Sequence, residues 1–281
     1  MELKEERLVK IRSMNANDIP ASARIGTEVG WPRHARRFEF FVRHPFCEAL
    51  VAESGGEVAG VGFGTRNGAA GWLGLICVSP EYQGKGMGGA LTSRVSELLQ
   101  RRGCRTLVLT ATEMGRPIYE KLDFSVETFY RGYAGPGIKS SPLHPGLRRM
   151  TPEDLPAVCE LDLRCTGEDR SHLLRATGGS GWMMAGEGGS VSGYHAPAPW
   201  GDGPVIASDA ETGRALVHLV RTLAGSGGTA KFWLTDESEE GREHMREIGF
   251  QEKRRLPRMV RGAQISWRPE SLWGLFSLAK G

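Results

Sequence analysis

Residues 76–91 read I-C-V-S-P-E-Y-Q-G-K-G-M-G-G-A-L and join a short apolar run to a glycine-rich bend and the start of a helix. The four glycines between Gly84 and Gly89 let the backbone approach a ligand without side-chain clashes. A helix that begins at such a bend offers unpaired N–H groups and the positive end of its dipole. The stretch therefore predicts a pyrophosphate site, to which Lys85 either adds a positive charge or contributes nothing as a solvated side chain.

The segments on either side of this bend alternate in a way that indicates an α/β fold. Before the bend, the patterns predict a helix and three antiparallel strands, over residues 21–44, 49–53, 58–66 and 72–78. After it, they predict a helix, a strand, a short helix and a closing strand, over residues 88–102, 106–110, 117–122 and 126–133. The expected fold class is α/β, or α+β, with a mixed, mostly antiparallel sheet and helices on both faces.

An internal repeat indicates two copies of this fold. Residues 11–20 return as residues 147–156, a displacement of 147 − 11 = 136. Residues 115–124 return as 241–250 at a displacement of 126, and residues 105–111 match 230–236 at 125. Because the order is preserved, we predict two tandem domains, 1–137 and 145–281, joined by a linker rich in glycine, proline and serine.

Composition excludes several classes of function. Lys and Arg total 36 against 33 Asp and Glu, so the net charge of +3 provides no general attraction to nucleic acid or to an acidic membrane. No apolar run approaches the ~20 residues of a membrane-spanning helix, and we expect the C-terminal L-W-G-L-F-S-L-A to be a strand of the second domain. The charged first residues do not resemble a signal peptide. The five cysteines and seven histidines are scattered, which predicts no metal site and a reducing, cytoplasmic location.

Residues 84–89 also satisfy G-x-G-x-x-G, which makes a dinucleotide-binding domain an alternative. In that fold the glycines follow the first strand, and an acidic residue ends the next strand. Here the bend follows a meander, and the strand at residues 106–110 ends without a carboxylate. An oxidoreductase is therefore the weaker interpretation.

Three blocks, at residues 76–91, 107–112 and 115–124, occur together and in one order. As a set they resemble the GCN5-related N-acetyltransferases (GNAT), over residues 9–133. The second half resembles the partner domain of a tandem group in that family, in which a D-R-x-x-L-L segment, here residues 169–174, follows the first helix. The protein is thus identified as a tandem GNAT protein whose second domain is degenerate.

The resemblance implies acetyl-CoA as co-substrate and Tyr119 as the catalytic tyrosine beside its sulfur. The residues implied to bind the pantetheine arm and the pyrophosphate are Ile76, Cys77, Val78, Gln83, Gly84, Lys85, Gly86, Met87, Gly88 and Gly89. An N–H at Val78 would stabilise the oxyanion. If the bend bound no cofactor, Tyr119 would be read as a half-buried helix residue bonded to water.

The residue that deprotonates the acceptor is not identified by the resemblance. An amine with a pKa of ~10.4 must lose a proton before it attacks, but residues 72–78 contain no carboxylate. Water, Glu28 and Glu53 are the candidates. Asp123 stands where the family usually has glycine, and Asp tolerates the left-handed conformation that a helix end requires.

The second copy lacks the residues that carry the chemistry. Residues 83–88 correspond to S-D-A-E-T-G at 208–213, whose two carboxylates would repel a pyrophosphate. Tyr119 corresponds to Met245, and Asp123 to Gly249. We therefore expect the second domain to shape the acceptor site and not to transfer acetyl groups.

The predicted function is acetylation of a primary amine, on a small molecule or a protein, by direct attack on the thioester. A non-catalytic acyl-CoA sensor is the alternative. The predicted partners are acetyl-CoA and the amine, without nucleic acid or membrane; the oligomeric state is not determined, and a homodimer is compatible with the sequence. We interpret one basic cluster as a solvated helix face; it comprises Arg33, His34, Arg36 and Arg37. We interpret an aromatic set as core residues, some of which reach the ligand; it comprises Trp31, Phe38, Phe40, Phe41 and Phe46.

Overall fold

The computed structural model describes residues 9–31, 35–198 and 203–281. The elements of the first half are β1 (Lys10–Ser13), α1 (Ile19–Glu28), α2 (Ala35–Arg43), β2 (Cys47–Ser54), β3 (Glu57–Asn67), β4 (Ala70–Val78), α3 (Met87–Arg101), β5 (Thr106–Thr110), α4 (Arg116–Glu120) and β6 (Ser125–Pro136). Those of the second half are β7 (Leu147–Arg149), α5 (Leu155–Thr166), α6 (Ser171–Ala176), β8 (Trp182–Ala185), β9 (Val191–His195), β10 (Val205–Ala207), α7 (Ala210–Ala224), β11 (Thr229–Thr235), α8 (Glu239–Glu247), β12 (Gln251–Gly262) and β13 (Leu272–Gly274).

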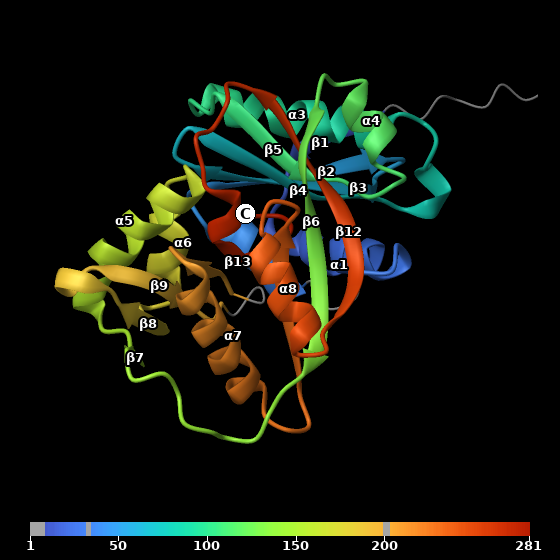
Figure 1. Ribbon diagram of the computed structural model, residues 1–281. Helices are drawn as coiled ribbons and strands as arrows, with labels where there is room; N and C mark the ends of the chain where they lie inside the picture. The colour runs from blue at the N-terminus through green and yellow to red at the C-terminus, as the bar shows by residue number, and fades with distance from the viewer. Residues whose placement is uncertain (1–8, 32–34, 199–202) are drawn as a thin grey trace, which may run out of the picture.

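These elements form two sheets with helices around them, which confirms the predicted α/β class (Figure 1). The larger sheet has the order β1-β2-β3-β4-β5-β12-β6-β11, and among its described strands β4 and β5 form the one parallel pair. The smaller sheet has the order β13-β10-β9-β8-β7 and is antiparallel. Instead of the single helix predicted over residues 21–44, two helices, α1 and α2, occupy this stretch.

The two sheets do not divide between the two halves of the sequence. Strand β12 lies between β5 and β6, and β11 adds to the far side of β6. The strand expected to close the first sheet, β6, is therefore separated from β5 by a strand that lies more than a hundred residues further along the chain. Figure 1 shows β6 and β12 side by side along the length of the molecule.

The predicted repeat is visible as a matching pair of ion pairs. Arg12 contacts both carboxylate oxygens of Asp18, at 2.7 and 2.8 Å, before α1 begins. Arg148 contacts Asp154 in the same way, at 2.7 and 2.6 Å, before α5. Each aspartate also closes a capping box with the residue three positions before it. Each residue of the second pair lies 136 positions after its counterpart in the first pair. The two sequence copies therefore fold alike at their starts.

A buried charged cluster ties β12 to the rest of the molecule. The guanidinium of Arg258 contacts Glu168 at 3.4 Å, forms an ion pair with Glu127 and donates a hydrogen bond to the hydroxyl of Tyr130 at 3.0 Å. Glu168 also accepts a hydrogen bond from the indole of Trp72 at 2.6 Å. The side chains of Arg258 and Glu168 are 1% and 4% exposed. Because Arg258 and Glu168 each have partners from both halves, the cluster joins the two halves.

The last residues of the chain are buried between the sheets. Residues 275–281 follow β13 and lie at the centre of the molecule (Figure 1). A Cβ at Gly74 would stand 2.6 Å from the Cα atom of Ala279, so the two backbones touch there. Asn67 donates a hydrogen bond to the carbonyl of Lys280 at 3.0 Å. This segment therefore packs on the same region of β4 from which the site is built.

Replacement of Arg258 by alanine should lower the free energy of unfolding by about 3–5 kcal/mol, because two carboxylates would lose their buried cation. Arg255→Ala is the matched control on the same strand. Its side chain is 44% exposed and pairs with Asp236 at 2.6 Å, so its loss should cost less than about 1 kcal/mol. Urea denaturation measures both changes; equal values would show that the buried cluster does not hold β12.

Candidate functional site

The site predicted from the sequence lies where β4 and β5 separate. The two strands pair from Ala70 with Thr106 to Leu73 with Leu109, and no further. Just beyond, Leu75 has a φ of 52°, and the register of β4 on β3 shifts between Val61 and Phe63. A β-bulge bends its strand and increases its twist. The bulge therefore coincides with the point at which β4 turns away from β5.

Beyond the bulge, one edge of β4 has no strand beside it. The N–H of Ser79 donates to the carbonyl of Ala59 at 2.9 Å, so it faces β3. Because the N–H groups of successive strand residues face opposite edges, those of Val78 and Ile76 face the gap that β5 has left. The carbonyl of Val78 accepts a hydrogen bond from the side chain of Gln83 at 3.0 Å. This edge offers a ligand the hydrogen-bonding groups of a missing strand.

The glycine-rich bend follows directly and is open to solvent. Gly84 and Gly86 have φ values of 76° and 79°, a conformation that favours glycine. No heavy atom lies within 4 Å of where a Cβ would stand at either residue. Lys85 donates to the carbonyl of Glu81 at 2.9 Å, so its charge is held at the bend.

Helix α3 begins at this bend without a side-chain cap. Gly86 is its N-cap residue, and no side chain accepts a hydrogen bond from the first turn. The first N–H groups of an α-helix have no partner within the helix, and the dipole adds a partial positive charge there. The bend and the helix end together make a backbone cradle of unpaired N–H groups, a type of site that attracts anions.

Tyr119 and Cys77 belong to the apolar clusters on opposite faces of β4. Tyr119, on α4, packs in the apolar cluster beneath α3, and burial raises the pKa of its phenol to about 12. Cys77 packs in the cluster beneath α1, and burial raises the pKa of its thiol to about 12. The nearby Cys77 contributes further to the raised pKa of Tyr119. At neutral pH both groups are protonated, so Tyr119 is a proton donor and Cys77 is a poor nucleophile.

The structure separates the two carboxylates considered as bases. Glu28 ends α1, and its Oε2 atom accepts a hydrogen bond from the hydroxyl of Ser79 at 3.1 Å, immediately after β4. Glu53 is on β2 and pairs with Arg12 at the β1 edge of the sheet. Strand β3 lies between β2 and β4, so Glu53 is remote from the site. Ser79 was not among the predicted residues; its place directly after the strand is the only sequence signal for it.

The equivalent region of the second half differs in two ways. Asp209 is the N-cap of α7, and its side chain accepts a hydrogen bond from the N–H of Thr212 at 2.8 Å, so a carboxylate already occupies this helix end. Strand β13 pairs with β10, the counterpart of β4. Its Trp273 packs so closely on Gly213 that a Cβ there would lie 2.2 Å from the indole. Met245, which matches Tyr119, is fully buried in the core.

The left-handed helix end has the same geometry in both halves. Asp123 has a φ of 62° and Gly249, at the matching position, a φ of 74°. The expectation that an aspartate adopts this conformation is confirmed. Of the aromatic set, Phe38 and Phe41 are core residues, at 0% and 1% exposed. Two members of the basic cluster, Arg33 and His34, lie outside the described residues.

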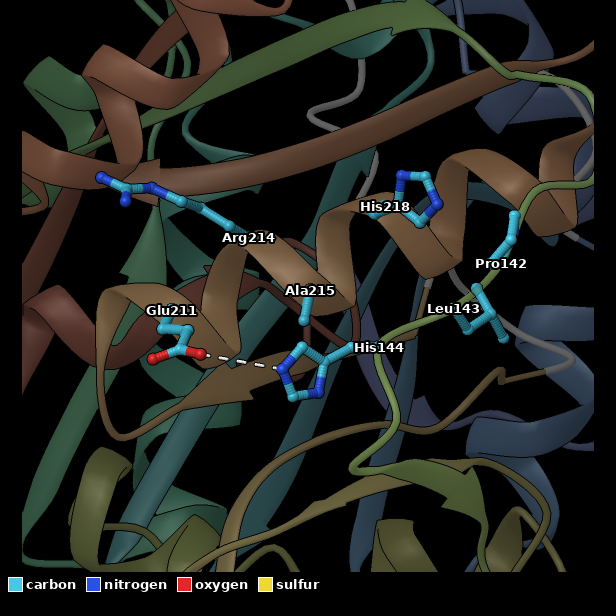
Figure 2. Close-up of a pocket in the computed structure, with 7 residues that line it drawn as sticks. All are labelled: Pro142, Leu143, His144, Glu211, Arg214, Ala215 and His218. Carbon is cyan, nitrogen blue, oxygen red and sulfur yellow. Dashed lines mark ion pairs between the residues drawn. The ribbon is translucent and has the colours of Figure 1, made fainter.

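A surface cavity of about 420 Å³ lies in the second half, away from the predicted site residues (Figure 2). Its lining residues are Pro142, Leu143, His144, Glu211, Arg214, Ala215 and His218. Figure 2 shows Glu211 and His144 directed toward one another, and the closest ion-pair distance is 3.7 Å. His218 already contacts the hydroxyl of Ser141 at 2.9 Å. The linker thus covers one side of α7 here.

Two matches to acetyltransferase (GNAT) domain models cover residues 45–126 and 158–274. The chain belongs to the GNAT acetyltransferases, with two such domains in tandem. YitH, an uncharacterised N-acetyltransferase of Bacillus subtilis strain 168, is 23% identical over 98% of this chain and 99% of its own. An acetyltransferase of Yersinia pestis is 36% identical over 28% of this chain and 57% of its own.

Solved structures resemble this fold over most or all of the chain. A candidate acetyltransferase from Pyrococcus horikoshii superposes over 100% of both chains with a TM-score of 0.81 and 21% identity. A tandem GNAT protein from the clavulanic acid biosynthesis pathway superposes over 92% of this chain and 100% of its own, with a TM-score of 0.63 and 16% identity. At these identities the likeness concerns the fold alone.

Among residues 9–31, 35–198 and 203–281, His, Cys, Asp and Glu side chains form no group of three or more that could hold a metal ion. Over the same residues, no helix has both the length and the apolar character that crossing a membrane requires.

Gly86→Ala should lower the free energy of unfolding by about 1–2 kcal/mol, since alanine is strained at positive φ. Gly88→Ala is the control in the same bend. A Cβ there would meet Ile118 at 3.7 Å and Val78 at 3.9 Å, which are ordinary contacts, so its stability should not fall. Urea denaturation of both variants is the measurement; no loss in Gly86→Ala would mean that Gly86 does not need its positive φ.

Proposed function

We propose that this protein transfers the acetyl group of acetyl-CoA to a primary amine, using the gap between β4 and β5. The supporting observation is the combination of an uncapped α3 with the unpaired edge of β4 directly before it. Residues Gln83 to Gly89 would hold the pyrophosphate with backbone N–H groups, and Lys85 would add a positive charge. Ile76 and the carbonyl of Val78 would pair with the amide groups of the pantetheine arm.

The residues around this edge can perform the transfer without a covalent enzyme intermediate. The N–H of Val78 faces the gap, where it would donate a hydrogen bond to the thioester oxygen as negative charge develops. Tyr119 would give its proton to the departing sulfur, which its raised pKa of about 12 permits at neutral pH. The thiol of Cys77 stays protonated and buried, which favours direct attack by the amine.

The second half would not bind acetyl-CoA in this scheme. Asp209 supplies the negative charge at the start of α7 that a phosphate would otherwise supply, and a second anion would meet repulsion. Trp273 fills the space against Gly213. We propose that this half closes the first sheet through β12 and borders the acceptor site.

Titration of the whole chain with acetyl-CoA should give a stoichiometry of one, measured by isothermal titration calorimetry. Asp209→Asn, which keeps an acceptor for the N–H of Thr212 and removes the charge, should leave this value at one, because Trp273 still fills the gap. A value of two in the unaltered chain would contradict the assignment of the site to the first half.

Tyr119→Phe should reduce kcat about 100-fold with an unchanged affinity for acetyl-CoA, because only proton donation is lost. Tyr133→Phe is the matched control, since Tyr133 lies on β6 and its hydroxyl contacts Glu252 at 3.3 Å. Release of free thiol during turnover of a panel of amines measures both. Tight binding of acetyl-CoA with no turnover of any amine would instead favour an acyl-CoA sensor.

A further inference from the structure

The two faces of β4 are distinguished by the side chains next to Val78. Cys77 packs with Ile25 of α1, whereas Ile76 and Val78 pack against the cluster beneath α3. Because side chains alternate along a strand, Ser79 lies on the same face as Cys77, the one that α1 covers. The face beneath α3 belongs to the coenzyme cradle, so a second substrate must approach the peptide of Val78 from the α1 face.

Glu28 stands at this point of approach. It follows Ile25 by three positions on α1, which places both on one side of the helix. Its carboxylate accepts the hydrogen bond from the Ser79 hydroxyl at 3.1 Å, and the N–H of Ser79 is itself anchored to β3. Glu28 is also the last residue of α1, where the helix dipole adds partial negative charge. The negative charge of the carboxylate and the partial negative charge of the helix end together attract a cation.

The Glu28 carboxylate is available, in contrast to the carboxylates of Glu53 and Glu127. Its side chain is 37% exposed, and its contact with the exposed Arg24 is long, at 3.6 Å. Glu53 is held by Arg12 at the sheet edge, and Glu127 is neutralised by the buried Arg258. Within the described parts of the chain, Glu28 is the carboxylate that is hydrogen-bonded to the residue following β4.

We propose that Glu28, acting with the hydroxyl of Ser79, binds the acceptor as an ammonium ion and takes its proton. This inference rests on the proposed acetyl transfer and names the class of acceptor, an aliphatic amine that is positively charged at neutral pH. A carboxylate selects such an amine over a neutral or anionic acceptor by its charge. The exposed side chain allows the remainder of the acceptor to lie in solvent.

The protons balance through two residues. An ammonium ion loses two protons in becoming an amide, as the nitrogen–carbon bond forms and the carbon–sulfur bond breaks. The departing sulfur gains one proton from Tyr119, and one of the two protons lost by the ammonium ion then restores the phenol. The other proton passes to Glu28, directly or by way of the Ser79 hydroxyl, and from the exposed carboxylate to water. The net products are the amide, the thiol and one released proton.

Two acceptors separate this role from a structural one: an aliphatic diamine, charged at pH 7, and an aromatic amine that is neutral there. Glu28→Gln should reduce kcat/KM about 100-fold for the diamine and change it little for the aromatic amine, which needs neither ion pairing nor prior deprotonation. Ser79→Ala should reduce kcat/KM for the diamine by a smaller factor and should also change it little for the aromatic amine. Glu28→Asp should recover part of the activity toward the diamine.

Glu57→Gln, at the exposed first residue of β3, should have the same kcat/KM for both amines as the unaltered protein. The affinity for acetyl-CoA should be the same in every variant. Turnover of the diamine by Glu28→Gln at the unaltered rate, or an equal loss for both amines, would overturn the inference while acetyl transfer stands. Absence of turnover with either amine in the unaltered protein would overturn the proposed function, and this inference with it.

Discussion

The insertion of β12 between β5 and β6 is the constraint on which the rest of the structure depends. A central strand must satisfy the N–H and C=O groups of the strands on both sides of it, so neither β5 nor β6 is complete without the second half. The buried guanidinium of Arg258 adds a charge requirement, because its carboxylate partners come from β6 and from the segment after α5. The two copies of the fold consequently share one sheet and one buried charged cluster.

The same arrangement leaves an open strand edge in the first half and closes the corresponding edge in the second. In the first half β4 leaves β5 after Leu73, and the strand that completes the sheet, β12, pairs with β5 on its other side. In the second half β13 pairs with β10, and Trp273 takes the space beside the first turn of α7. A gap between strands persists only where no other segment fills it. Gly88 and Gly213 match in the repeat but have different surroundings: Gly88 has room for a Cβ, whereas Gly213 is packed against Trp273.

The starts of α3 and α7 differ in the group that accepts hydrogen bonds from their first N–H groups. Every α-helix begins with unpaired N–H groups, and some acceptor must satisfy them. In α7 the acceptor is the side chain of Asp209, which is part of the fold. In α3 the N-cap is Gly86, which has no side chain, so the acceptor must come from water or from a ligand. One residue at each helix start therefore decides whether a side chain of the fold supplies the acceptor.

The sequence by itself determined the α/β class, the repeat and the position of the cradle. These features depend on local patterns, namely apolar periodicity, glycines at left-handed positions and a bend at a helix start. β5, for example, spans residues 106–110 as predicted. Only the tertiary structure decided which strands are neighbours, that Glu53 is bound to Arg12 at a sheet edge, and that Glu28 contacts Ser79 beside the end of β4. These two contacts join residues that are 41 and 51 positions apart, and the pairing of β12 with β5 joins residues about 150 positions apart. Because such contacts depend on how the sheet assembles, they leave no local pattern in the sequence.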